Sequence, residues 1–198
     1  FMLPRSGWVV PSELPDLRGS NLIAIDTETK DDGLATGRGP GWVYKAGYIC
    51  GVSMSAGGRS VYAPIRHPST NNFDEDAVRR WTKDHLESSA SKVFHNAQYD
   101  LGWFRAQWDL LPPADIDCTQ IMSFMLDADR ISHSLDNVCK EYGVQGKDET
   151  TLRMAAEAMG CDPKKDLWRM PAKFVGGYAE QDAVGTLEIA QIMLNKLE

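Results

Sequence analysis

The stretch Leu22-Ile23-Ala24-Ile25-Asp26-Thr27-Glu28-Thr29 decides how this chain folds and where its chemistry lies. Its first four residues form an apolar run after Gly19-Ser20-Asn21, which predicts a buried β-strand. Asp26 and Glu28 follow the run directly, and alternation along an extended chain places positions i and i+2 on one face. Two neighbouring carboxylates repel each other unless a cation lies between them. The pair therefore indicates either a divalent-metal site, since such cations take oxygen ligands, or the solvated end of a strand.

The pattern outward from this stretch predicts an α/β chain. The glycine pair Gly57-Gly58 indicates a hairpin between two strands, which gives antiparallel pairing. An amphipathic helix then permits a crossover to a parallel neighbour, so we expect one mixed sheet. We expect an irregular lead at 1–20, a glycine-rich loop at 31–47, further strands at 48–54, 60–65, 92–95 and 116–118, and helices at 74–87, 97–108, 119–127, 134–142, 150–159 and from about 173 to the end.

Composition limits the class of protein. The chain has 198 residues, of which 42% are hydrophobic and 25% charged, as expected for one globular domain. It has no apolar run of about 20 residues and no signal peptide, so we expect no membrane association. Four cysteines without a CxxC pair predict no zinc site and a reduced, cytoplasmic protein. The net charge of −7 excludes a basic coating protein but not a nuclease whose acidic residues hold metal ions.

A second polar group follows the strand predicted at 92–95. Asn96 is either the N-cap of the next helix or a group that hydrogen-bonds substrate. Asp100 lies four residues later and projects from the same helix face. His95 ends the strand, where a structural role is favoured over that of a ligand or base.

A third polar group lies on the last predicted helix. Tyr178 and Asp182 are four residues apart, which places the hydroxyl and the carboxylate on one face. Gly176-Gly177 precedes them and would let a ligand or a neighbouring backbone approach closely. Each polar group alone is compatible with an ordinary surface contact, so only their combination is specific.

Together the three groups resemble a known motif set. Asp26-x-Glu28, Asn96-x-x-x-Asp100 and Tyr178-x-x-x-Asp182 resemble the motifs of the DEDD 3′–5′ exonuclease superfamily in its tyrosine variant. The histidine variant has a histidine where this sequence has Gly177. The local sequence looks like the proofreading exonuclease domain of family A, DNA polymerase I-type enzymes, phage ones included. The resemblance runs from about residue 21 to residue 196.

The resemblance implies an RNase H-like α/β fold, with a five-stranded mixed sheet flanked by helices, over residues 21–198. It also implies hydrolysis of terminal phosphodiesters with two divalent metal ions, Mg²⁺ or Mn²⁺. By motif position, Asp26 would bridge both ions, while Glu28 and Asp182 would complete the site that activates water. Asp100 would hold the second ion.

Further roles follow from motif position. Tyr178 would orient the attacking water, since a phenol with a pKa near ~10 is neutral at pH 7. Asn96 and Tyr99 would contact the terminal nucleotide, and Thr29, beside the carboxylates, would also bind substrate. Thr27 should point away from Asp26, which favours core packing.

The expected substrate is a single-stranded or frayed 3′ end of DNA, delivered by a polymerase domain in the same chain or in a partner. The alternatives are an exoribonuclease resembling RNase D, or a domain of this fold that binds nucleic acid without cutting it. All four acidic residues and the tyrosine are present, which favours an enzyme. The chain is compatible both with a fragment of a longer polymerase and with a stand-alone nuclease.

Aromatic residues occur in two settings. The glycine-rich segment at 31–47 either grips single strands by charge and base stacking or forms a solvated, mobile loop. Its candidate contacts are Arg38, Trp42, Tyr44 and Lys45. We expect core packing for Trp81, Trp103, Phe104, Trp108, Met122, Met125 and Met154.

Overall fold

The strand β1 (Leu22–Asp31) lies at the centre of the sheet. The computed structural model describes residues 2–68, 71–111, 113, 115–146 and 148–197. The strand order is β3-β2-β1-β4-β5, with β1 antiparallel to β2 and parallel to β4. The other strands are β2 (Gly47–Ala56), β3 (Arg59–Pro64), β4 (Ser91–Phe94) and β5 (Ile116–Cys118). The five-stranded mixed sheet that we predicted is confirmed.

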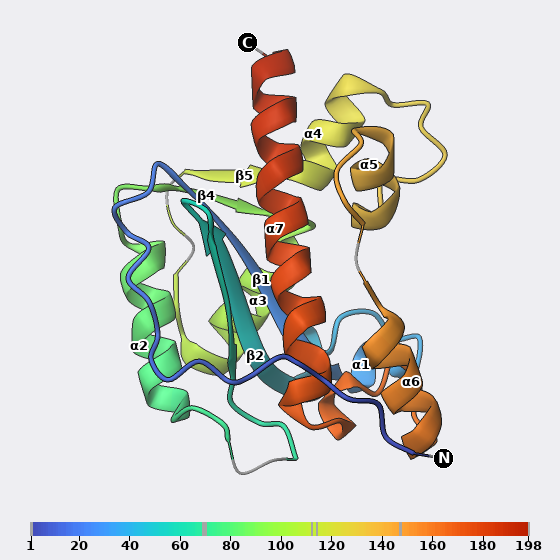
Figure 1. Ribbon diagram of the computed structural model, residues 1–198. Coiled ribbons are helices and arrows are strands. Elements are labelled where there is room, and N and C mark those ends of the chain that lie inside the picture. Colours follow the sequence, from blue (N-terminus) through green and yellow to red (C-terminus); the bar gives the residue numbers. More distant parts are fainter. Residues whose placement is uncertain (1, 69–70, 112, 114, 147, 198) are drawn as a thin grey trace.

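Helices cover both faces of this sheet (Figure 1). The long helix α7 contacts β1, β2 and β3 on one face, while α2 and α3 pack on the other. The helices are α1 (Asp32–Ala35), α2 (Glu75–Leu86), α3 (Ala97–Trp108), α4 (Thr119–Leu126), α5 (Leu135–Glu141), α6 (Thr150–Met159) and α7 (Ala172–Leu197), with 3₁₀ turns η1 (Gly41–Tyr44) and η2 (Leu167–Arg169).

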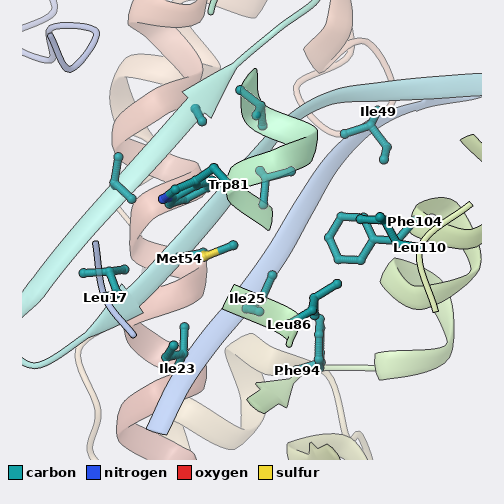
Figure 2. Packing of buried hydrophobic residues seen from close by; sticks show 14 of the residues in the cluster. Leu17, Ile23, Ile25, Ile49, Met54, Trp81, Leu86, Phe94, Phe104 and Leu110 are labelled. Carbon is teal, nitrogen blue, oxygen red and sulfur yellow. The ribbon is translucent and has the colours of Figure 1, made fainter. Parts of the chain in front are cut away.

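Alternation along β1 sends its side chains to the two faces. Ile23 and Ile25 are fully buried in the larger core with Phe94, and Figure 2 shows Ile25 near its pairing partner Met54 and near Leu86. Burying each such side chain stabilises the fold by about 1.5–3 kcal/mol. Ala24 points to the opposite face, where it packs in a small cluster beneath α7. Asp26 and Glu28 share the parity of Ala24 and so face α7.

β1 is longer than the apolar run predicts. It pairs with β2 from Ala24 to Asp31, with a register shift between Glu28 and Thr29. Backbone hydrogen bonds to β2 extend β1 through the polar residues 26–31, which the apolar pattern of the sequence does not mark as strand. Pairing with β4 covers only Leu22 to Ala24, so the β4-facing edge of β1 is open beyond Ala24.

Two expectations are wrong. The glycine-rich segment is not one long loop, because it contains α1 and η1. Within it, the indole of Trp42 packs on α3 at Gly102. A Cβ atom added to Gly102 would lie only 2.3 Å from that indole. Met125 and Met154 are 68% and 51% exposed rather than core residues. Their helices are amphipathic, and both residues fall on the outward face. Trp81, Trp103, Phe104, Trp108 and Met122 are buried, as predicted.

The N-terminal lead packs on α7 rather than extending into solvent. A Cβ on Gly176 would lie 2.1 Å from the Trp8 indole, and Trp8 Nε1 donates to Glu180 Oε1 at 3.0 Å. The glycine pair therefore admits a tryptophan side chain of the lead, instead of the ligand or backbone that we considered. None of the helices in the described ranges has both the length and the apolar character needed to cross a membrane.

Substitution of Gly176 by alanine should destabilise the protein by about 1–3 kcal/mol, because the new methyl group overlaps the Trp8 ring. Gly177→Ala is the matched control, since its nearest neighbour is a Trp8 atom at 4.0 Å, and it should stabilise the helix by up to about 1 kcal/mol. In a Trp8→Ala background the cost of Gly176→Ala should disappear. Urea unfolding of wild type, Gly176→Ala, Gly177→Ala, Trp8→Ala and the Trp8→Ala/Gly176→Ala double variant measures these free energies. A loss of stability from Gly176→Ala that persists without Trp8 would contradict the proposed packing.

Candidate active site

Three carboxylates meet on the α7 face of β1. One oxygen each from Asp26, Glu28 and Asp182 lies within 4.8 Å of the other two. Glu28 and Asp182 are each 7% exposed, and Asp26 is half-buried. The site thus joins two residues of the central strand to one residue more than 150 positions later in the chain.

Helix α7 brings Asp182 and Tyr178 to this face. Phe174, Val175 and Ala179 are buried in a cluster with Tyr62 of β3, which fixes the first half of α7 on the sheet. Tyr178 precedes Asp182 by one helical turn, so both lie on the sheet-facing side. The charges of Asp182, Glu28 and Asp26 act on the Tyr178 hydroxyl, which places the phenol beside the carboxylates. The structure therefore brings together the first and third predicted motifs.

Asp100 lies at the open edge of β1 and is not one of the three acids whose oxygens converge within 4.8 Å. Its Oδ1 accepts hydrogen bonds from the Thr27 backbone N–H at 2.9 Å and from the Thr27 hydroxyl at 2.7 Å. The backbone donor is available because β4 stops pairing with β1 after Ala24. Thr27 is buried, as expected, but its role is to hold a predicted metal ligand. The alternation of side chains along the strand predicted the direction of the Thr27 side chain. Nothing in the sequence pointed to Asp100 as its hydrogen-bond partner.

Asn96 is the N-cap residue of α3, but its side chain does not cap the helix. Its backbone is left-handed, with φ of 62° and ψ of 53°, a conformation that asparagine adopts more readily than most residues. Its side chain makes no capping hydrogen bond within the described chain and is exposed. The predicted N-cap position is thus confirmed, the expected side-chain cap is not formed, and binding of substrate remains a prediction.

Thr29 and Tyr99 take part in a hydrogen-bond network with Asp31, a residue that the sequence analysis did not single out. Tyr99 Oη donates to Asp31 Oδ2 at 2.8 Å, so the Thr29 hydroxyl, 2.7 Å away, is the donor to Tyr99. Asp31 Oδ1 accepts from the backbone N–H groups of Leu34 and Gly41. The network ties the glycine-rich segment to β1 and α3. Contact of Thr29 and Tyr99 with a nucleotide stays a prediction.

His95 has a structural partner. Its Nδ1 lies 2.8 Å from Thr119 Oγ1, and that hydroxyl donates to the Phe94 carbonyl. Nδ1 of His95 is therefore the donor to Thr119. This bond joins the end of β4 to the start of α4, which agrees with the structural role favoured from the sequence.

Residues 14–198 match the DNA_pol_A_exo1 family, described as 3′–5′ exonuclease. The chain belongs to this 3′–5′ exonuclease family. It is 36% identical over 195 residues to a DNA-directed DNA polymerase of Pseudomonas phage M6, covering 92% of this chain and 28% of the polymerase. It is 27% identical to DNA polymerase I of Pseudomonas aeruginosa, covering 93% of this chain and 19% of that enzyme. The exonuclease chain thus spans less than a third of the length of these polymerases.

Solved structures of exonucleases share its fold. Brucella melitensis NrnC with bound Mg²⁺ superposes with a TM-score of 0.59 at 20% identity, covering 92% of this chain and 76% of that one. Trypanosoma brucei RNase D, in complex with RNA U12, gives 0.63 at 18% identity, covering 89% of this chain and 56% of that one. The RNase H-like fold expected from the motifs is confirmed.

The residues of this site suit a divalent cation, as membership of the family implies. Asp26, Glu28 and Asp182 offer carboxylate oxygens, the ligands that Mg²⁺ and Mn²⁺ prefer. Glu28 and Asp182 are almost fully buried, where unbalanced negative charge is costly. A cation bound among the three oxygens would remove that cost.

Burial governs the protonation of Asp100 and Tyr178 at this site. Desolvation raises the pKa of Asp100 to about 7, although hydrogen bonds from Thr27 oppose the shift. Desolvation also raises the pKa of Tyr178 far above its ordinary value, and the charges of Asp182, Glu28 and Asp26 add to the effect. Tyr178 is therefore un-ionised at neutral pH.

In EDTA, the contribution of Asp100 to the free energy of unfolding should fall as the pH rises from about 4 to about 7, whereas the buried His67, whose pKa desolvation lowers to about 4, contributes a slope of the opposite sign. In that window the unfolded chain releases the Asp100 proton while the folded chain retains it, because the folded pKa is raised to about 7. The slope of this Asp100 contribution should approach about 1.4 kcal/mol per pH unit. Asp100→Asn should remove this component, and urea unfolding at several pH values compares the two proteins. Equal slopes in both would show that the buried Asp100 carboxyl does not retain its proton.

Proposed function

We propose that this domain hydrolyses the terminal phosphodiester at the 3′ end of DNA and releases 5′-mononucleotides. The observation that carries the proposal is the convergence of one oxygen each from Asp26, Glu28 and Asp182 within 4.8 Å. Tyr178 lies one helical turn before Asp182 on α7. DNA is favoured over RNA because the relatives with 36% and 27% identity are DNA polymerases. The solved structures of NrnC and RNase D, at 20% and 18% identity, support the fold alone.

Two divalent cations, Mg²⁺ or Mn²⁺, would neutralise the charge that develops on the phosphate and lower the pKa of the attacking water. Asp26, Glu28 and Asp182 would hold one of them. Asp100, at the neighbouring edge of β1, would help to hold the other. The retention of all four acids argues against a domain that only binds nucleic acid.

Tyr178 acts in this proposal by orientation. Its hydroxyl keeps its proton at neutral pH, so it holds the water through a hydrogen bond rather than by removing a proton. The Asn96 amide, exposed at the start of α3, would bind the terminal nucleotide. The ring of Tyr99, fixed by Thr29 and Asp31, would form the adjoining wall.

The net charge of −7 shapes how DNA is bound. Few phosphate contacts are available to such a surface, so affinity for long DNA should be weak and should depend only modestly on salt. The relatives are longer DNA polymerases. We therefore propose that a polymerase domain, in the same chain or in a partner, delivers the 3′ end.

Tyr178→Phe removes one hydroxyl and keeps the ring. If the hydroxyl orients the water, turnover under single-turnover conditions should fall roughly ten- to a hundredfold, the size of a hydrogen bond to a charged or polarised group of about 1.5–3 kcal/mol. Asp182→Ala should cost more, because it removes a metal ligand. Tyr142→Phe, at the C-cap of α5 and packed against the far half of α7, is the matched control and should cut like wild type. A Tyr178→Phe enzyme with wild-type turnover would contradict the assignment.

The direction and substrate of cleavage test the function itself. A 5′-labelled single-stranded DNA, incubated with Mg²⁺ or Mn²⁺, should give a ladder that shortens steadily from full length. A mismatched 3′ end should be degraded faster than a paired one, since unpairing and unstacking cost a few kcal/mol, and less at a mismatch. Immediate release of the 5′ label as mononucleotide, or opening of circular DNA, would rule out the 3′–5′ direction. Faster digestion of the RNA of the same sequence would instead identify an exoribonuclease.

A further inference from the structure

Two hydroxyl groups near the carboxylates are buried without a hydrogen-bond partner among the described residues. They are Ser53 Oγ on β2 and Thr186 Oγ1 on α7, in side chains that are 0% and 1% exposed. A buried hydroxyl left without a partner costs about 1–3 kcal/mol, and most buried polar groups in folded proteins have one. Such groups therefore call for an explanation.

Ser53 lies directly beside Asp26. The two residues are paired in the β1–β2 register, so their side chains point to the same face of the sheet with Cβ atoms about 4.5–5.5 Å apart. That face is covered by α7, which contacts β1 and β2. The Ser53 hydroxyl is thus enclosed between the sheet and α7, next to a predicted metal ligand.

Thr186 lies one helical turn beyond Asp182. A spacing of four residues puts the two side chains on the same face of α7. The next residue, Leu187, packs with Ala24 of β1, which lies one alternation step before Asp26 on the same strand face. Thr186 therefore lies on the stretch of α7 between Asp182 and the Leu187 contact with Ala24.

We infer that Ser53 and Thr186 are positioning residues, which donate hydrogen bonds to carboxylate oxygens of Asp26 and Asp182 when a divalent cation is bound. The inference rests on the proposed function in that it uses the same cation site. A carboxylate that holds a cation keeps lone pairs for a donor, and groups that hydrogen-bond metal ligands orient them and tune affinity. The hydroxyls would thus favour one rotamer of each acid.

Thr82 supplies a matched control within the same chain. Its Oγ1 is also buried without a partner among the described residues, in a side chain that is 0% exposed. It lies on α2, on the opposite face of the sheet from α7. Comparison of Thr186→Val with Thr82→Val therefore separates loss of a buried hydroxyl in general from loss of one beside the carboxylates.

The test is a Mn²⁺ titration of the full chain without nucleic acid, by calorimetry, together with melting temperatures in EDTA. Ser53→Ala, Thr186→Val and Thr82→Val should keep or raise the melting temperature in EDTA, because each removes an unpartnered polar atom. Ser53→Ala and Thr186→Val should each weaken the Kd for Mn²⁺ about tenfold or more. Thr82→Val should bind Mn²⁺ like wild type, and Thr186→Ser, which retains the hydroxyl, should do the same.

Three outcomes would overturn the inference. If wild type binds Mn²⁺ and degrades DNA, unchanged Mn²⁺ affinity in both Ser53→Ala and Thr186→Val would overturn the inference but not the proposed function. Equal weakening in Thr82→Val would assign the effect to the core in general. A wild-type protein that binds no Mn²⁺ would overturn the inference and the proposed function together.

Discussion

Mutual repulsion among three carboxylates is the constraint that the rest of this structure has to meet. Two unit charges about 4 Å apart repel by about 4 kcal/mol at an effective dielectric constant of 20, and Asp26, Glu28 and Asp182 offer oxygens within 4.8 Å of one another. The strand that carries two of them is held by β2 along almost its whole length. The helix that carries the third is 26 residues long and buries residues along its length. The strand and the helix thus hold the three carboxylates close together against their mutual repulsion, which a bound cation would remove.

Small side chains let these two elements approach closely. Ala24 of β1 and Ala190 of α7 are both fully buried and pack in one cluster. Gly51 of β2 leaves room for the ring of Tyr62, with which a Cβ would clash at 2.4 Å. Larger residues would separate the helix from the sheet and move Asp182 away from Asp26 and Glu28. The packing of apolar residues thus sets the geometry of the acidic ones.

The fourth acid is placed by a different device. Because β4 leaves β1 after Ala24, the strand exposes a backbone N–H at Thr27, and Asp100 of α3 accepts it. Three acids therefore lie on one face of β1 and the fourth at its edge. The same divergence lets the start of α3 approach β1, with Asn96 exposed beside it. In the proposed function, this arrangement gives the two cations distinct surroundings and leaves an accessible amide for the terminal nucleotide.

The sequence by itself determined most of the elements and the identity of the candidate acids. Period-two and period-3.6 patterns act locally, so they predicted α2, α3 and the β2–β3 hairpin closely, and the spacing of Asp26, Glu28, Asp100, Tyr178 and Asp182 carried the family resemblance. The length of β1 was decided by its pairing with β2, because hydrogen bonds between distant segments leave no local signal. For the same reason only the tertiary structure showed that Thr27 holds Asp100 and that Asp31 fixes Tyr99. It also showed that Trp8 covers Gly176 and that Ser53 and Thr186 lie buried beside the acids, since each of these contacts joins residues or elements whose proximity depends on the complete fold.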